Sequence, residues 1–124
     1  MLLCDTNILI EVFRGNALIE TELRSIGIDN IAVSDITRAE LFYGALNKGE
    51  LHTIRKYLNR FPTLHISDEI SEIAVDLVEQ FCLFHKLDIN DAQIAATAIY
   101  HNFNLYALNI KDFAFIPNLQ LHIP

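Results

Sequence analysis

The chain opens with MLLCDTN (residues 1–7), in which four apolar residues are followed by three polar ones. A short apolar run of this kind is typical of a strand that is buried on both faces of a sheet. We therefore predict a strand over residues 1–5 that ends at Asp5. In open parallel sheets ligands bind beyond the carboxyl ends of the strands, so Asp5 stands where a functional site is expected.

Helix-like and strand-like segments alternate along the rest of the chain. Apolar residues at helical spacing predict helices within residues 18–26, 36–46, 51–61, 70–84 and 90–99. Short apolar runs predict further strands at residues 31–34, 64–66, 105–108 and 121–123. Because strands separated by helices form parallel sheets, we predict an α/β fold with a central parallel sheet and helices on both faces. No linker or repeat divides the chain, so we predict one domain over residues 1–124.

Several single residues sharpen these expectations. Gly27 is expected to stop the first of these helices, and Ser34, Ser67 and Asn90 are expected to cap the starts of later ones. The helix that follows Ser34 is expected to bury one face, made of Ile36, Ala39, Tyr43 and Leu46.

The composition fits a folded protein and excludes some functions. Of the 124 residues, 52% are hydrophobic and only four are Gly, which is too apolar for a disordered chain. No stretch reaches the ~18 apolar residues of a membrane span, and no export signal precedes Asp5, so we expect a cytoplasmic protein. Cys4 and Cys82 lack metal-ligand spacing and are expected to be reduced, buried thiols.

The chain carries a formal charge of −7, from nine basic and sixteen acidic residues. This charge alone argues against binding a polyanion such as RNA. Binding of divalent cations by several of the carboxylates would offset a large part of it. The alternative is an acidic surface that only keeps the protein in solution.

Four acids follow a predicted strand or lie on the inner side of a predicted helix: Asp5, Glu40, Asp91 and Asp112. Each also has an ordinary structural explanation. Asp5, Asp91 and Asp112 could act as caps. Glu40 could lie at the edge of the apolar stripe, with its carboxylate reaching solvent or pairing with a base such as Arg38 or Lys48. As a set they predict one cleft in which unneutralised carboxylates would repel each other. Oxygen ligands of this kind suit Mg²⁺ or Mn²⁺, which can activate water for hydrolysis of a phosphodiester.

The sequence resembles the PIN domains, and within them the VapC-type toxins of toxin–antitoxin pairs. The resemblance covers nearly the whole chain and rests on four motifs in order: Asp5-Thr6-Asn7, Ser34 through Glu40 to Gly44, Asn90-Asp91-Ala92 with Ile94-Ala95-Ala96, and Asn109 with Asp112-Phe113. By this resemblance Asp5, Glu40, Asp91 and Asp112 form a catalytic metal site, supported by Thr6, Asn7 and Asn109.

The resemblance also implies a function and partners. Family members are Mg²⁺- or Mn²⁺-dependent endoribonucleases, commonly homodimers, which act on transfer or ribosomal RNA and are inhibited by a cognate antitoxin. Basic residues close to the motifs are candidates for RNA contact, with Arg38 first among Arg14, Arg38, Lys48, Lys86 and Lys111.

The fourth motif departs from the family pattern, because Ala107 and Leu108 stand where a hydroxyl residue and a polar or basic residue are usual. Asp112 is consequently the least secure of the four ligands. Two other functions stay open at this point. One is a binding module with impaired catalysis, and the other is a phosphotransfer domain with Asp5 as nucleophile, although its usual partner acid is replaced by Asn7.

Overall fold

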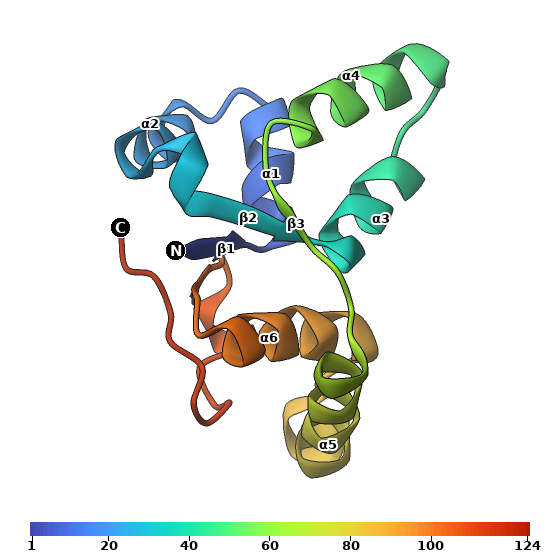
Figure 1. The fold of residues 1–124 in the computed structure, drawn as a ribbon, viewed down its shortest axis with the longest axis vertical. Helices are drawn as coiled ribbons and strands as arrows, with labels where there is room; N and C mark the ends of the chain where they lie inside the picture. Colours follow the sequence, from blue (N-terminus) through green and yellow to red (C-terminus); the bar gives the residue numbers. More distant parts are fainter.

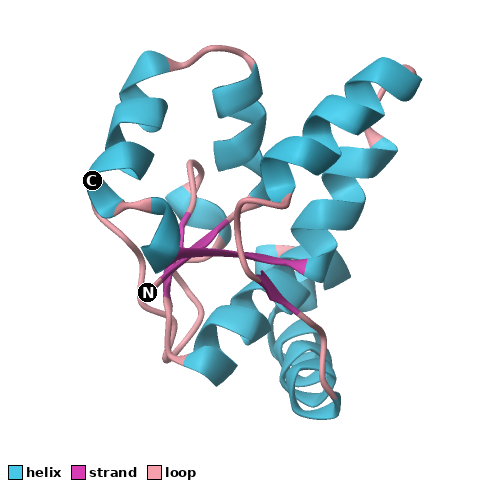
Figure 2. Cartoon of the chain, turned by 45° about the horizontal axis from the view of Figure 1, so that its top comes forward, coloured by secondary structure: helices cyan, strands magenta, loops and turns pink.

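The centre of the molecule is a sheet of four parallel strands in the order β3-β2-β1-β4. The computed structural model describes residues 1–124, with strands β1 (Leu2–Cys4), β2 (Ile31–Ser34), β3 (Thr63–Leu64) and β4 (Asn104–Tyr106). These strands are short and are enclosed by helices (Figure 2). The predicted α/β fold with a parallel sheet is confirmed.

Six α-helices and two short 3₁₀ turns connect and follow the strands. The α-helices are α1 (Thr6–Phe13), α2 (Ala17–Ile26), α3 (Asp35–Tyr43), α4 (Lys48–Leu58), α5 (Asp68–His85) and α6 (Ile89–His101). The 3₁₀ turns are η1 (Ile28–Asn30) and η2 (Ile110–Asp112). Helices α1, α2 and α4 lie on one side of the sheet, and α5 and α6 lie on the other (Figure 1).

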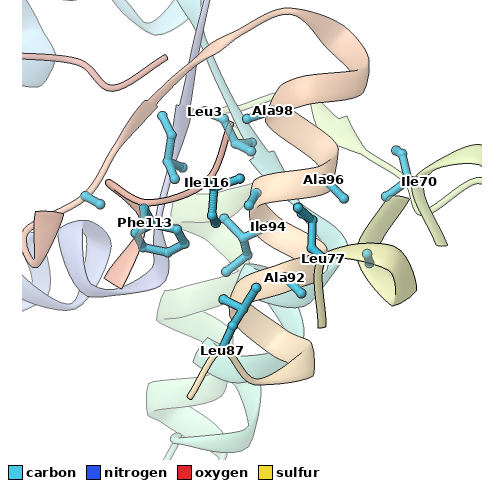
Figure 3. Packing of buried hydrophobic residues seen from close by; sticks show 14 of the residues in the cluster. Leu3, Ile70, Leu77, Leu87, Ala92, Ile94, Ala96, Ala98, Phe113 and Ile116 are labelled. Carbon is cyan, nitrogen blue, oxygen red and sulfur yellow. The ribbon is translucent and has the colours of Figure 1, made fainter. Parts of the chain in front are cut away.

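Two hydrophobic cores, one on each face of the sheet, hold these layers together. Successive side chains of a strand point to opposite faces. Leu3 accordingly packs with α5 and α6, whereas Leu2 and Cys4 pack with α1, α2 and α4. Figure 3 shows Leu3 beside Ala98 of α6, a helix in which several alanines are fully buried. Small side chains on α6 therefore allow its backbone to approach the sheet and α5 closely, as predicted.

Most of the predicted boundaries are confirmed by local chemistry. Ser34 Oγ accepts the Thr37 N–H at 3.1 Å at the start of α3, and Ser67 Oγ accepts the Ile70 N–H at 3.2 Å at the start of α5. Gly27 ends α2 with φ of 92°, a backbone conformation that glycine adopts at little cost.

Other expectations were wrong. Helix α1 was not predicted as a separate element, and Asp88 rather than Asn90 caps α6, through a 2.8 Å bond from the Asp91 N–H to Asp88 Oδ1. The segment at residues 121–123 forms a single bridge, Leu105 to Leu121, instead of a strand. A local apolar pattern does not show whether a neighbouring strand can pair with every residue of the segment.

The expected buried face of α3 was also wrong. Tyr43 is 93% exposed and Leu46 is 85% exposed, while Thr37 and Leu41 are buried. Thr37 tolerates burial because its hydroxyl has hydrogen-bond partners, which removes most of the desolvation penalty. Apolar residues, in contrast, are often found on protein surfaces.

The two cysteines differ in burial, and neither forms a disulfide. Both cysteines are free thiols, and burial followed by the charge of Asp5 raises the pKa of Cys4 to about 12. Cys4 is therefore an unreactive core thiol, whereas Cys82 is only partly buried. None of the helices combines the length and the apolar character needed to cross a bilayer.

Candidate active site

The candidate site lies at the carboxyl end of β1, where the order of the strands in the sheet changes direction. The chain passes from β1 to β2 on one side and returns as β4 on the other side of β1. The loops after β1 and β4 consequently separate at the carboxyl end of β1, which is the usual position of a ligand site in such sheets. Asp5 is held there by a 2.9 Å bond from its N–H to the Tyr106 carbonyl.

The other three acids reach this edge from separate segments. Glu40 is carried by α3, which follows β2; Asp91 lies in the first turn of α6; and Asp112 ends η2, which follows β4. Helix α3 and η2 follow strands that end at the carboxyl edge of the sheet. Helix α6 follows α5 instead, and its first turn lies near Glu40 through the contact of Asn90 Nδ2 with Glu40 Oε2. The sequence positions span more than a hundred residues, so only the fold brings them together.

The electrostatics show that these acids share one environment. Burial raises the pKa of the Asp5 carboxyl to about 6, partly opposed by the Thr6 N–H and reinforced by the charges of Glu40 and Asp112. Asp5 is only 5% exposed, which makes desolvation the dominant cause. Perturbed carboxyls of this kind cluster at functional sites.

Asp91 is perturbed in the same direction. Burial raises the pKa of its carboxyl to about 7, and the charges of Asp88, Asp5, Asp112 and Glu40 raise it further. The charges of the other three acids of the predicted set thus contribute to the raised pKa of Asp91, and those of Glu40 and Asp112 contribute to the raised pKa of Asp5.

No basic side chain forms an ion pair with a member of this cluster. The ion pairs of the structure join Arg14 to Glu11, Arg24 to Glu20, His65 to Asp35 and His122 to Glu22, and none includes a member of the set. The expected alternative for Glu40, a pair with Arg38 or Lys48, is therefore wrong. The side chains as placed do not converge tightly enough for any three to share an ion.

Glu40 is fixed by polar neighbours. Thr6 Oγ1 donates to Glu40 Oε1 at 2.7 Å, and Asn90 Nδ2 donates to Glu40 Oε2 at 3.5 Å. These bonds link α3 to α1 and to the start of α6. Thr6 thus makes a contact of the kind predicted for it, and Asn90, which was expected as a cap and as part of the third motif, contacts Glu40 instead of capping α6.

The other proposed supporting residues lack such contacts. Asn7 is exposed, and the side chain of Asn109 makes no cap bond, although its carbonyl accepts the Asp112 N–H at 3.0 Å. Ala107 is buried in the core beside α6, so the fourth segment offers no hydroxyl at that position. The supporting roles of Asn7 and Asn109 stay predictions.

None of the candidate basic residues forms an ion pair with one of the four acids. Arg38 stacks over Phe42, 5.5 Å from the ring centroid, on a side of α3 that is about 160° from Glu40 at ~100° per residue. RNA contact by Arg38 stays a prediction that this position does not favour. Arg14 and Glu40 instead line one groove of about 670 Å³ between α1, α3 and α4.

Comparison with known proteins places this geometry in a family. A parallel sheet with unpaired carboxylates at its switch point defines an α/β protein with an acidic, oxygen-rich site. The PIN domain family model matches residues 2–114, and the chain belongs to that family.

Individual relatives extend the similarity. The chain is 31% identical over 124 residues to a protein of Mycobacterium tuberculosis named ribonuclease VapC19, covering 97% of this chain and 98% of that protein. It is similar in structure to a chain in a toxin–antitoxin complex from Klebsiella pneumoniae, with TM-score 0.82, 36% identity, and coverage of 96% and 95%. It is also similar to a chain of VapBC2 from Rickettsia felis, whose structure was solved with a DNA fragment from the VapBC2 promoter. The TM-score is 0.83 at 30% identity, and the match covers 98% of this chain and 96% of that chain.

Proposed function

We propose that the chain is a divalent-metal-dependent endoribonuclease and the toxin of a VapBC-type toxin–antitoxin pair. The observation that carries this proposal is the cluster of Asp5, Glu40, Asp91 and Asp112 at the switch point, in which no member has a cationic partner. Leaving several carboxylates together without neutralisation costs folding free energy, which a bound cation would recover. Similarity to proteins named ribonucleases supports RNA as the substrate.

The donor set fits Mg²⁺ or Mn²⁺. Both ions take oxygen ligands, and all four side chains are carboxylates. Asp5, Glu40, Asp91 and Asp112 would hold the ion after turning toward one another from their present positions. When bound, the cation offsets charge on a phosphodiester and makes water a better nucleophile.

The chain's own residues prepare this site. Burial keeps bulk water away from Asp5, which strengthens its interaction with any cation. Thr6 and Asn90 orient the carboxylate of Glu40. The same acids would repel the phosphates of RNA when no metal is present, so metal binding also decides whether the substrate can approach.

We further propose an antitoxin protein as partner, because similar chains are found in toxin–antitoxin complexes. A homodimer, a transfer or ribosomal RNA substrate and a cytoplasmic location complete the proposal, on the strength of the family resemblance.

Metal removal tests the proposed activity. Purified protein incubated with total RNA is expected to cut it in Mg²⁺ or Mn²⁺, to stop when EDTA is added, and to resume when excess metal is restored. Gel electrophoresis of the RNA measures this result. Cleavage that continues in EDTA, or no cleavage with any divalent ion, would contradict the proposal, and the second outcome together with antitoxin binding would favour the binding-module alternative.

A further inference from the structure

Three buried hydroxyl groups form a line that ends on Glu40. Ser34 Oγ lies 3.4 Å from Thr37 Oγ1, which lies 3.0 Å from Thr6 Oγ1, which in turn lies 2.7 Å from Glu40 Oε1. Ser34 and Thr37 are fully buried, and Thr6 is nearly so. The line connects the end of β2, the first turn of α3 and the start of α1.

The number of protons fixes the direction of these bonds. An ionised carboxylate only accepts, so the single hydroxyl proton of Thr6 is donated to Glu40. The 3.0 Å contact between Thr6 and Thr37 then requires Thr37 to be the donor. With its own proton committed, Thr37 can only accept from Ser34, whose oxygen also receives the Thr37 N–H at 3.1 Å.

Thr37 occupies a position that frees its hydroxyl for this purpose. Buried Thr97, well inside α6, donates to the Gln93 carbonyl at 2.7 Å, four residues earlier in the same helix. Thr37 is the third residue of α3, where no helical carbonyl lies four residues back, and its hydroxyl crosses to α1 instead. Stabilising the start of α3 explains the bond from the Thr37 N–H to Ser34 Oγ. It does not explain the bond from the Thr37 hydroxyl to Thr6 on α1.

We propose that Thr37 is a positioning residue, which acts through Thr6 to hold Glu40 ready for a divalent cation. This inference rests on the proposed metal-dependent function. Donation by Thr37 fixes the rotation of the Thr6 hydroxyl and polarises it, so that the bond to Glu40 is stronger in the buried setting. Groups that orient a metal ligand in this way contribute to metal affinity.

A double-mutant cycle on Mn²⁺ affinity tests the inference, with isothermal titration calorimetry as the readout. Thr37→Val removes the hydroxyl at nearly constant shape and is expected to weaken Mn²⁺ binding roughly threefold to tenfold, the worth of one neutral hydrogen bond. Thr37→Ser, which retains the hydroxyl, is expected to restore most of the affinity. In a Thr6→Val background, Thr37→Val is expected to have almost no further effect, because its target is already gone.

Thr97→Val is the matched control, since it removes an equally buried hydroxyl that bonds only within its own helix. It is expected to leave Mn²⁺ affinity unchanged. If Thr37→Val does not fold, Thr37→Cys replaces it, because a thiol is a weak donor of similar size and should give an intermediate loss.

The outcomes separate this inference from the proposed function. If the wild type binds Mn²⁺ and cuts RNA, the proposed function stands. If in addition Thr37→Val binds Mn²⁺ as tightly as the wild type, or loses the same affinity with and without Thr6→Val, only the role of Thr37 is overturned. Wild-type protein that neither binds Mn²⁺ nor cuts RNA overturns both.

Discussion

Asp5→Asn is expected to lower RNA cleavage at least ~10²-fold, the loss typical of removing a group that stabilises charge in a transition state. Asn keeps the shape of the side chain, and the Asp5 side chain makes no cap bond to α1, so this helix should still start at Thr6. What disappears is one negative charge among four that have no cationic partner. Asp91→Asn is expected to give a similar loss, because that carboxyl belongs to the same cluster.

Asp76→Asn is the control for this pair. Asp76 is an exposed acid on α5, outside the cluster and outside every ion pair, so its variant should cleave RNA like the wild type. Initial cleavage rates on one RNA preparation, with all proteins purified in parallel, give the comparison. Equal rates for wild type, Asp5→Asn and Asp91→Asn would indicate a contaminating nuclease. Growth arrest on induction should likewise occur with the wild type and Asp76→Asn but not with the two site variants.

The second large effect of Asp5→Asn is on stability: the substitution that lowers activity is expected to stabilise the folded protein. Metal-free Asp5→Asn is expected to be more stable than the wild type at neutral pH. Raising the pKa of Asp5 from 3.8 to about 6 means that its charge costs the folded state up to about 3 kcal/mol once it is ionised. The neutral Asn side chain avoids this cost.

The pH dependence follows from the sign of the shifts. Because the folded-state pKa values of Asp5 and Asp91 lie above the ordinary value, the folded protein binds more protons than the unfolded chain between about pH 4 and pH 7. The favourable contribution of the protonated acids is complete at the low end of this window and is lost as pH rises. The stability advantage of Asp5→Asn should therefore be small near pH 4 and largest above pH 7.

Chemical denaturation of both proteins in EDTA at several pH values measures this difference. Added Mn²⁺ should then stabilise the wild type at pH 7.5 and leave Asp5→Asn nearly unchanged, because a ligand stabilises only the state that binds it. An Asp5→Asn protein that is less stable than the wild type at every pH would contradict the electrostatic account. A phosphate stably attached to Asp5 would instead support the phosphotransfer alternative.

The sequence was most informative where local pattern and position agree. The start of the chain predicted both β1 and the place of Asp5, because a buried strand has a simple apolar signature and its end lies at the ligand-binding edge. Residues 31–34 were predicted as β2 with the observed bounds, and Ser34 and Ser67 were predicted as caps. The cap bonds of Ser34 and Ser67 reach only three residues along the chain. Strands β1 and β2 pair with distant residues, but their apolar runs are visible in the local sequence.

Glu40 illustrates the limit of such patterns. It was singled out for lying beside an apolar stripe that included Tyr43, yet Tyr43 is almost fully exposed. The relevant contacts reach Thr6, which is 34 residues away, and Asn90, which is 50 residues away. The spacing of three residues between Thr37 and Glu40 was a signal that these side chains are neighbours on α3. Their common contact with Thr6 depends on how α1 packs against α3.

The central claim, that the acids of this edge bind a divalent cation, is tested most directly by titrating metal-free protein with Mn²⁺ in a calorimeter. We expect saturable binding to the wild type and to Asp76→Asn, with binding to Asp5→Asn and Asp91→Asn weakened at least ~10-fold. Absence of binding to the wild type, or equal affinity in all four proteins, would contradict the claim.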